Sequence, residues 1–361
     1  MLDPTTQAAL NGTLTSPSWG TGLSGYFNLV NGLPVPLYLY AVDDVGNQIP
    51  YTGTGTTPLL LPANDSTPVA FTTDIYYILR NALTGAFVTV MMTALQGAST
   101  PQGPLMAVAV GPMNLLPPNQ IGSYPKPNQD MPLPTDTPRV LVGAGMMATS
   151  PSGILVREQF WQRSGDSYTL APGTKRTVST TLVSGVQNTS SHQDAVSKSL
   201  GLSGSFGWGP VSASISANLS STSTSFQQVT VSSESTQYES LELKNDTKHT
   251  QMYLRWQLTD VLTVFLPASS TNMPAPTDPI FPPPSNGPGG YTPVTSVQIA
   301  QSPVLIGGPY NPDRLPAAPA PHPAMSAAAA AAVQARRLNR TVMLTAPAAS
   351  GGKRKAPSRR R

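Results

Sequence analysis

The sequence contains no cysteine and little charge. Without cysteine there are no disulfide bonds, thiol nucleophiles or thiolate metal ligands. Only 11% of the residues are charged, and the three histidines, His192, His249 and His322, are scattered, with no pair at the i, i+4 spacing of a helical metal site. We therefore expect no bound metal, no cofactor and no enzymatic activity.

Long apolar stretches are also missing. No run approaches the roughly 18–20 apolar residues that a transmembrane helix needs. Residues 1–16 have neither the basic start nor the apolar core of a secretory signal. We expect a chain that is synthesised as a soluble protein without a recognisable signal peptide.

Proline, glycine and hydroxyl side chains are abundant instead. The 361 residues include 39 prolines and 30 glycines, which favours β-structure joined by irregular linkers. The predicted fold class is all-β, in four parts. These are an N-terminal β-sandwich in residues 1–100, a Pro-rich connection in 101–139, an elongated antiparallel β module in 140–310, and a disordered tail in 311–361.

The second β unit carries several strand patterns, some long for a sandwich. A last strand over 296–307 is expected to close the unit. The other predicted strands are 155–162, 168–170, 177–186, the hairpin 196–219, 226–231, 238–243 and 252–265.

The net charge of +4 is unevenly distributed. Residues 336–361 hold nine basic side chains and no acid, so the rest of the chain is net negative. We expect the Pro/Ala-rich tail, 311–361, to be disordered, with a transient helix in 325–338. Its charge suits weak binding to an anionic surface, or to nucleic acid through phosphate contacts.

Two groups of carboxylates invite an acid/base or cation-binding interpretation. Asp43 and Asp44 stand beside a turn signal at Gly46-Asn47, and Glu239 and Glu242 flank Leu241 on a predicted strand. We interpret the first pair as turn-forming and the second as part of a solvated strand face.

Residues 196–219 alternate between apolar and polar side chains, as a strand requires, and Lys198 is the one charged residue at a position of the apolar set. Parity reverses across a tip of four residues, Gly207, Trp208, Gly209 and Pro210. A four-residue turn that pairs Phe206 with Val211 therefore keeps one face apolar. That face carries Leu200, Leu202, Phe206, Val211, Ala213, Ile215, Ala217 and Leu219, and the opposite face carries Ser199, Ser203, Ser205, Ser212, Ser214 and Ser216.

The polar face of this hairpin is nearly uncharged. Between Asp194 and Glu234 only Lys198 is ionisable, whereas wet sheet faces of soluble proteins usually carry charge. In hydrocarbon a hairpin inserts only as part of a closed barrel, with apolar side chains toward lipid and polar ones toward the lumen. About ten residues per arm matches the ~9–11 of a tilted transmembrane strand. The alternative is a half-buried hairpin of a Ser-rich sandwich or adhesin.

Residues 155–265, with this hairpin inside them, resemble the pore-forming module of aerolysin-like β-pore-forming toxins. The resemblance implies a receptor-binding domain followed by a β module whose hairpin refolds into a barrel after oligomerisation. It also implies a target membrane and a homo-oligomer as partners, and action outside the producing cell. The eight apolar residues listed above would then face lipid, and the six serines the pore lumen.

The string 26–47, YFNLVNGLPVPLYLYAVDDVGN, with Leu61-Pro62 and Leu83-Thr84-Gly85 downstream, resembles the β domain of the von Hippel-Lindau protein over residues 20–95. That family is a β-sandwich used for binding, so the resemblance implies a recognition module. No His-Pro-Trp follows Phe71, so the family's binding surface does not transfer.

The sequence therefore predicts a pore-forming protein that binds a target membrane, oligomerises and inserts a β-hairpin. The alternative is a non-enzymatic structural or adhesive β protein that binds surfaces without permeabilising them.

Overall fold

A computed structural model describes residues 2–17, 19, 23–52, 58–92, 105–122, 136–147, 153–186, 225–226, 235–267 and 290–310. Its regular elements are almost all strands, so the all-β prediction is confirmed. The described elements also include one short α-helix, α1 (Pro4–Leu10), and one turn of 3-10 helix, η1 (Pro112–Asn114). Within the described part of the chain, no helix is long and apolar enough to cross a membrane.

The strands follow one another along the chain with bounds that extend or join several of the predicted ones. They are β1 (Ser24–Asn31), β2 (Leu37–Val42), β3 (Gln48–Pro50), β4 (Leu60–Leu61), β5 (Asp65–Thr72), β6 (Tyr76–Asn81), β7 (Phe87–Met92), β8 (Met106–Val110), β9 (Val140–Met146), β10 (Ile154–Leu170), β11 (Lys175–Val186), β12 (Ser235–Lys244), β13 (Gln251–Pro267) and β14 (Tyr291–Tyr310).

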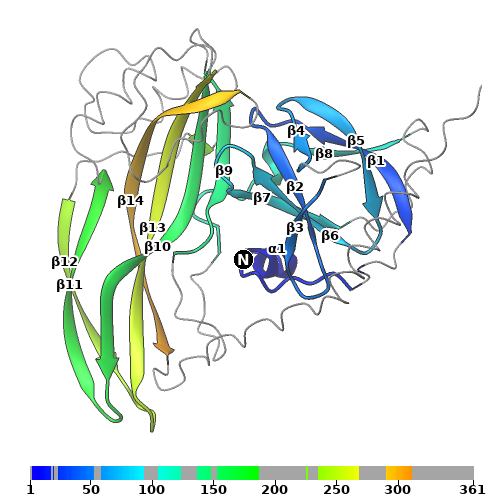
Figure 1. The fold of residues 1–361 in the computed structure, drawn as a ribbon. Coiled ribbons are helices and arrows are strands. Elements are labelled where there is room, and N and C mark those ends of the chain that lie inside the picture. Colours follow the sequence, from blue (N-terminus) through cyan, green and yellow to red (C-terminus); the bar gives the residue numbers. More distant parts are fainter. Residues whose placement is uncertain are drawn as a thin grey trace, which may run out of the picture.

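The N-terminal strands form two packed layers. A small sheet with the order β5-β1-β8 lies over strands β2, β6 and β7 (Figure 1). Alternate residues of β1 are buried, as a strand with one core-facing side requires. Phe27 and Leu29 of β1 share one core with Leu39 of β2 and Leu79 of β6. Strand β8, from the predicted Pro-rich connection, is an edge strand that pairs in parallel with β1.

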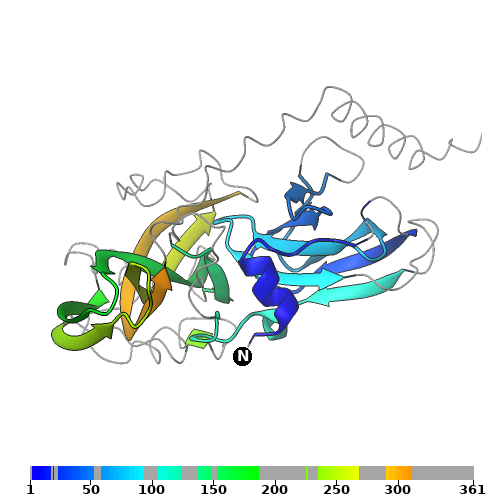
Figure 2. The ribbon, with the colours of Figure 1, turned by 90° about the horizontal axis from the view of Figure 1, so that it is seen from below.

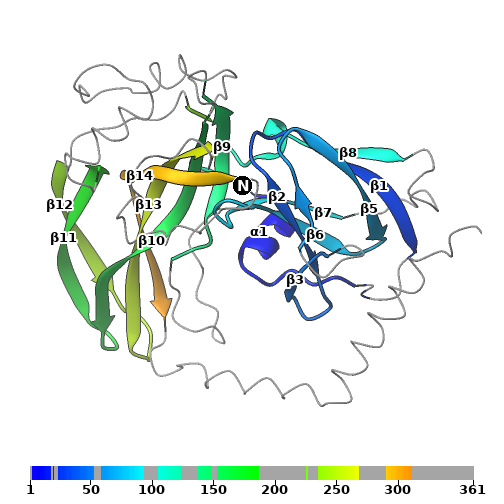
Figure 3. The same cartoon turned by 45° about the horizontal axis from the view of Figure 1, so that its top comes forward.

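The second layer continues without a break into the rest of the molecule. Among the described residues it is an 11-stranded sheet, ordered β12-β11-β14-β13-β10-β9-β7-β6-β2-β3 with β4 paired to β2. The junction is narrow, because β7 and β9 meet at a single parallel pair, Phe87 with Val140. Figure 3 shows β9 and β7 linking the long strands to the sandwich.

The helix α1 covers the face of the junction that the small sheet leaves open (Figure 2). Leu10 of α1 shares a core with Ile78, Val142 and Trp256, which come from β6, β9 and β13. Asp3 caps the helix by accepting from the Thr6 backbone N–H at 2.9 Å, and Pro4 begins it. This helix is not among the elements predicted from the sequence, although Asp3-Pro4 is a helix-start signal.

Long strands dominate the C-terminal half. The patterns predicted as two strands over 155–162 and 168–170 are one strand, β10, with a register shift between Arg163 and Ser167. Strand β14 runs over 20 residues, longer than the predicted 296–307. The prediction of a strand over 226–231 is wrong at Phe226, because Ser225 and Phe226 lie in a 3-10 turn.

The Asp43 carboxylate forms the turn between β2 and β3. It accepts from the backbone N–H groups of Val45 and Asn47, at 3.0 and 2.7 Å, and Gly46 takes a positive φ of 90°. The turn-forming interpretation is confirmed for Asp43.

Candidate functional site

The predicted membrane-inserting residues, the predicted lumen residues and the hairpin tip, all within 196–219, lie outside the described residues. The structure describes the two strands from which this segment leaves and to which it returns. Strand β11 ends at Val186 and β12 begins at Ser235. Apart from Ser225 and Phe226, residues 187–234 lie between these ends and outside the description.

Strands β11 and β12 form one antiparallel ribbon. Ten consecutive pairs run without a bulge from Lys175 opposite Lys244 to Ser184 opposite Ser235. Figure 1 places this ribbon at the outer edge of the long sheet, beside β14. The chain therefore enters and leaves the 187–234 segment from directly neighbouring strands, as a longer hairpin would require.

The two faces of the ribbon differ in chemistry. On one face, Val178 and Leu243 are buried in a small cluster with Leu170, and Leu241, which lies opposite Val178, is 41% exposed. The exposed Arg176, opposite Leu243, lies on the same face. The other face is polar, since it carries exposed serines and an exposed ion pair between Lys175 Nζ and Glu242 Oε1 at 3.3 Å. The solvated-face interpretation of Glu242 is confirmed by its 58% exposure.

The base of the ribbon is fastened by Asn245, which is fully buried in the turn after β12. Its side-chain amide donates to the carbonyl oxygens of Leu170, at 3.0 Å, and His249, at 2.8 Å. The Tyr253 hydroxyl also donates to the Lys244 carbonyl, at 2.8 Å. These bonds join the β10–β11 and β12–β13 turns.

At its other end the ribbon touches the sheet only briefly. The described pairing between β11 and β14 consists of Gly185 with Ala300 and Val186 with Ile299. By contrast, β13 and β14 pair over almost their whole lengths. The ribbon therefore shares few ladder hydrogen bonds with the sheet, and its separation from β14 would break few.

A buried ion pair crosses the long sheet near the ribbon. Arg157 of β10 donates from Nε to Asp260 Oδ1 at 3.0 Å and from Nη2 to Asp260 Oδ2 at 2.9 Å. The two side chains are 1% and 0% exposed. The Gln301 amide donates to Asp260 Oδ2 at 2.6 Å, and Arg157 Nη1 donates to the Ser225 carbonyl oxygen. Strands β10, β13 and β14 are thus joined to one point of the 187–234 segment.

A second buried carboxylate lies where the sandwich meets β10. Glu158 accepts from the Thr84 hydroxyl and, at 3.4 Å, from the Asn81 amide, both from the sandwich. The Arg139 guanidinium lies 3.8 Å from its other oxygen. Burial raises the pKa of Glu158, and the Thr84 hydrogen bond and the Arg139 charge oppose that shift.

Sequence reasoning missed both buried groups, although a signal existed. Arg157, Glu158 and Gln159 are consecutive polar residues inside an otherwise apolar stretch, and Asp260 is the single charged residue in 256–267. Where two strands have the apolar pattern of buried strands, opposite charges within them predict an ion pair, because an unpaired buried charge is costly.

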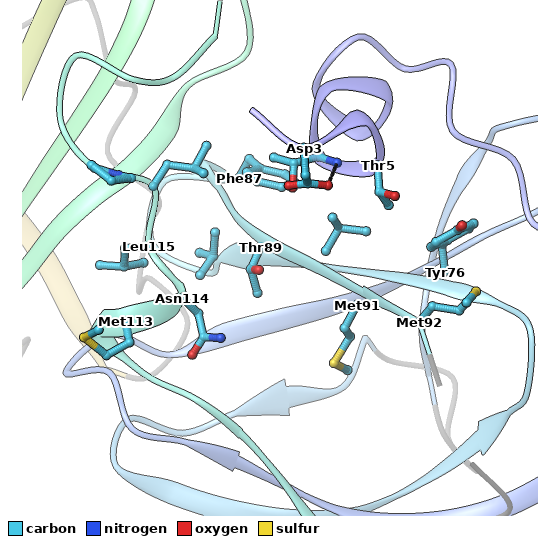
Figure 4. A pocket seen from close by; sticks show the side chains of 15 residues that line it. Asp3, Thr5, Tyr76, Phe87, Thr89, Met91, Met92, Met113, Asn114 and Leu115 are labelled. Carbon is cyan, nitrogen blue, oxygen red and sulfur yellow. Dashed lines mark hydrogen bonds between the residues drawn. The ribbon is translucent and has the colours of Figure 1, made fainter. Parts of the chain in front are cut away.

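An open pocket of about 570 Å³ lies between α1, β7 and η1 (Figure 4). Methionines 91, 92 and 113 and Leu115 line much of it, and Met113 is 95% exposed. Asp3 also lines the pocket, and its pKa is lowered mainly by the Thr6 side-chain hydrogen bond. That carboxylate is engaged in capping the helix.

Comparisons with known proteins give low similarities. No family model and no curated protein matches the chain. One similar solved structure is that of Cry35Ab1, at 12% identity and a TM-score of 0.33, covering 79% of this chain and 89% of that one. Another is that of the oligomeric pore-forming toxin pro-Monalysin, at 11% identity and a TM-score of 0.25, covering 47% of this chain and 69% of that one.

Proposed function

We propose that this protein permeabilises target membranes, with residues 187–234 inserting as an extension of the β11–β12 ribbon. Several copies would contribute such hairpins to one transmembrane β-barrel. The observation that carries the proposal is the register of the described ribbon, taken together with the alternation of the sequence that follows it.

The register fixes which residues would face each other if the ladder continued. From Ser184 opposite Ser235, each step toward the tip adds one residue on the first arm and removes one on the second. Continued through the predicted hairpin, this register matches apolar positions with one another. The resulting pairs are Leu200 with Leu219, Leu202 with Ala217, Gly204 with Ile215 and Phe206 with Ala213.

This register differs by two residues from the one that pairs Phe206 with Val211. Because side chains alternate with a period of two, a shift of two leaves every residue on the same face. The eight predicted lipid-facing residues then share their face with Val178, Leu241 and Leu243. The six predicted lumen serines share theirs with the exposed polar side of the ribbon. The buried Val178 and Leu243 support this assignment of the apolar face, although the exposed Arg176 lies on the same side of the ribbon.

Oligomerisation is required by the same physics. A single inserted hairpin leaves backbone donors and acceptors unpaired along both edges, at several kcal/mol each in hydrocarbon. Closure with hairpins from other copies removes these edges. Strand β12 is the terminal strand of the described sheet, so one of its edges is available for pairing.

The N-terminal sandwich would serve as the part that binds the target surface, and the protein would act without enzymatic chemistry, outside the cell that makes it. A packed sandwich core leaves its loops and edge strands for recognition.

Dye release from liposomes and from whole cells tests the proposal. Leu202→Asp places a charge on the predicted lipid face, and Ser203→Asp, its neighbour on the predicted lumen face, is the matched control. We expect Leu202→Asp to abolish release and Ser203→Asp to retain it, because charge is costly only toward lipid.

Equal release by Leu202→Asp and the unsubstituted protein would overturn the role of this hairpin. No release from any membrane, with intact binding to cell surfaces, would favour the structural or adhesive function instead.

A further inference from the structure

Ser225 and Phe226 are docked on the long sheet, away from the β11–β12 ladder. The Ser225 side chain is 6% exposed and Phe226 is fully buried. Both lie inside the 187–234 segment, on the arm that returns to β12. This pair, called here the 225–226 anchor, is the described contact between that segment and the sheet.

A glycine on β9 makes room for the anchor. A Cβ atom added at Gly143 would lie 2.2 Å from Ser225 Oγ, 3.2 Å from Ser225 Cβ and 3.4 Å from Phe226 Cε2. The first distance is far below any van der Waals contact, so a side chain at Gly143 would force Ser225 to shift. The anchor is therefore a close fit against the backbone of β9.

The buried Arg157 holds the backbone of the anchor. Two of its donors are fixed on the Asp260 carboxylate, and a third, Nη1, donates to the Ser225 carbonyl oxygen. Loss of the anchor would leave this donor without that acceptor in a site only 1% exposed, and an unpaired buried donor is unfavourable. The ion pair therefore favours the docked position.

The docked position and a continued ladder are mutually exclusive. At the ribbon's register, Ser225 would extend in a strand opposite Asp194, whereas it lies in a 3-10 turn on the sheet. Phe226 cannot be buried against Gly143 and also stand in the extended ribbon. The docked position and a continued ladder are therefore alternative arrangements of the same two residues.

We propose that the 225–226 anchor restrains the insertion segment before insertion, and that release of the anchor from Gly143 and Arg157 is required for insertion. This inference rests on the pore-forming function proposed above. The anchor raises the free-energy cost of extending the ribbon, because extension would lose both the burial of Phe226 and the hydrogen bond from Arg157 to Ser225.

A disulfide tests the anchor directly, because the natural chain has no cysteine. In Gly143→Cys/Ser225→Cys the two Cβ positions lie 3.2 Å apart, a few tenths of an ångström under the usual disulfide range, so a small shift allows the bond. We expect no dye release from the oxidised variant, and release at or above the unsubstituted level after reduction. The control, Ser179→Cys/Ser240→Cys, joins directly opposite residues of the ribbon and should release dye when oxidised.

The outcomes separate the two proposals. Release by the oxidised Gly143→Cys/Ser225→Cys protein would overturn the anchor while leaving pore formation intact. Absence of release from the unsubstituted protein and the ribbon control would overturn pore formation.

A measurement without membranes tests the anchor independently. Gly143→Ala displaces Ser225 without touching the ion pair, and should speed proteolytic cleavage within 187–234 on the order of tenfold. Gly111→Ala is the matched control, since a Cβ there meets nothing within 4 Å. Equal cleavage rates for the two variants would contradict the anchor.

Discussion

Arg157 of β10 and Asp260 of β13 lie diagonally across the ladder and are joined by two parallel hydrogen bonds of 3.0 and 2.9 Å, in a site closed to solvent. Planar guanidinium and carboxylate groups match in this geometry, so each fixes the other's orientation. The pair sits where β10 is covered on both of its faces, and its remaining bonds reach β14 and the 225–226 anchor.

Removal of one member of this pair should be strongly destabilising. Arg157→Met leaves Asp260 buried and uncompensated, which typically costs about 3–5 kcal/mol. Urea denaturation monitored by tryptophan fluorescence measures the loss. The double variant Arg157→Met/Asp260→Leu should recover much of it, because no unpaired charge remains. A double variant whose loss equals the sum of the single losses would show that the two charges are not coupled.

Glu158 predicts a pH dependence of stability. Its folded pKa is raised above the ordinary value of 4.5, mainly by burial, so the unfolded chain loses this proton first as the pH rises. The contribution of Glu158 to stability is therefore present at low pH and falls as the pH rises from about the ordinary value through the raised one.

The variant Glu158→Gln isolates this contribution, since the amide cannot ionise. The difference in unfolding free energy between the variant and the unsubstituted protein should shift in favour of the variant between pH 4.5 and pH 8. Urea titrations at several pH values measure it. A difference that stays constant with pH would contradict the raised pKa.

The register of the inserted hairpin can be tested by cysteine pairs. If the ribbon's ladder continues, Ser203 lies opposite Ser216, whereas the four-residue turn places it opposite Ser214. We expect Ser203→Cys/Ser216→Cys to form a disulfide in membrane-bound oligomers faster than Ser203→Cys/Ser214→Cys. Gel mobility under non-reducing conditions reports the bond. The reverse order would support the four-residue turn, with a two-residue change of register between Ser184 and the hairpin.

Charge on the predicted lumen face should change ion selectivity. Ser214→Lys and Ser214→Glu should shift the reversal potential of single channels in a salt gradient in opposite directions, because lumen side chains set the field in the pore. Conductance should persist in both. If both substitutions abolish conductance, Ser214 does not face the lumen.

The basic tail should bind anionic surfaces weakly. Each Lys or Arg near an anionic membrane contributes about 1 kcal/mol, and salt screens the attraction. Sedimentation with phosphatidylserine vesicles should therefore fall with added salt and on deletion of residues 353–361. Binding to neutral vesicles is the control, and a deletion without effect on either would exclude the tail as a membrane contact.

Much of the fold follows from local sequence. The β-formers of β2, β11 and β13 favour strands from local sequence, because branched and aromatic side chains suit a pleated surface. The Asp43 turn is equally local, since its carboxylate bonds backbone groups only two and four residues away. The alternation in 196–219 belongs to this class, and the assignment of its faces to lipid and lumen stays a prediction.

Other features depend on contacts between distant parts of the chain. Pairing of β7 with β9 turns the predicted sandwich and module into one sheet, and no local pattern specifies that single pair. The neighbours of Phe226 in the sequence predict the start of a strand, yet Phe226 lies in a 3-10 turn. Its ring is buried near Gly143, and Arg157 binds the carbonyl oxygen of the preceding Ser225.

The sequence by itself thus determined the strand-rich class, the Asp43 turn and the apolar–polar alternation of 196–219, because alternation and turn chemistry act over a few residues. Only the tertiary structure decided the register of the ribbon, the docking of Ser225 and Phe226, and the partners of Arg157. Those partners lie 68 and 103 residues away along the chain, and burial in the folded sheet is what makes their contacts favourable.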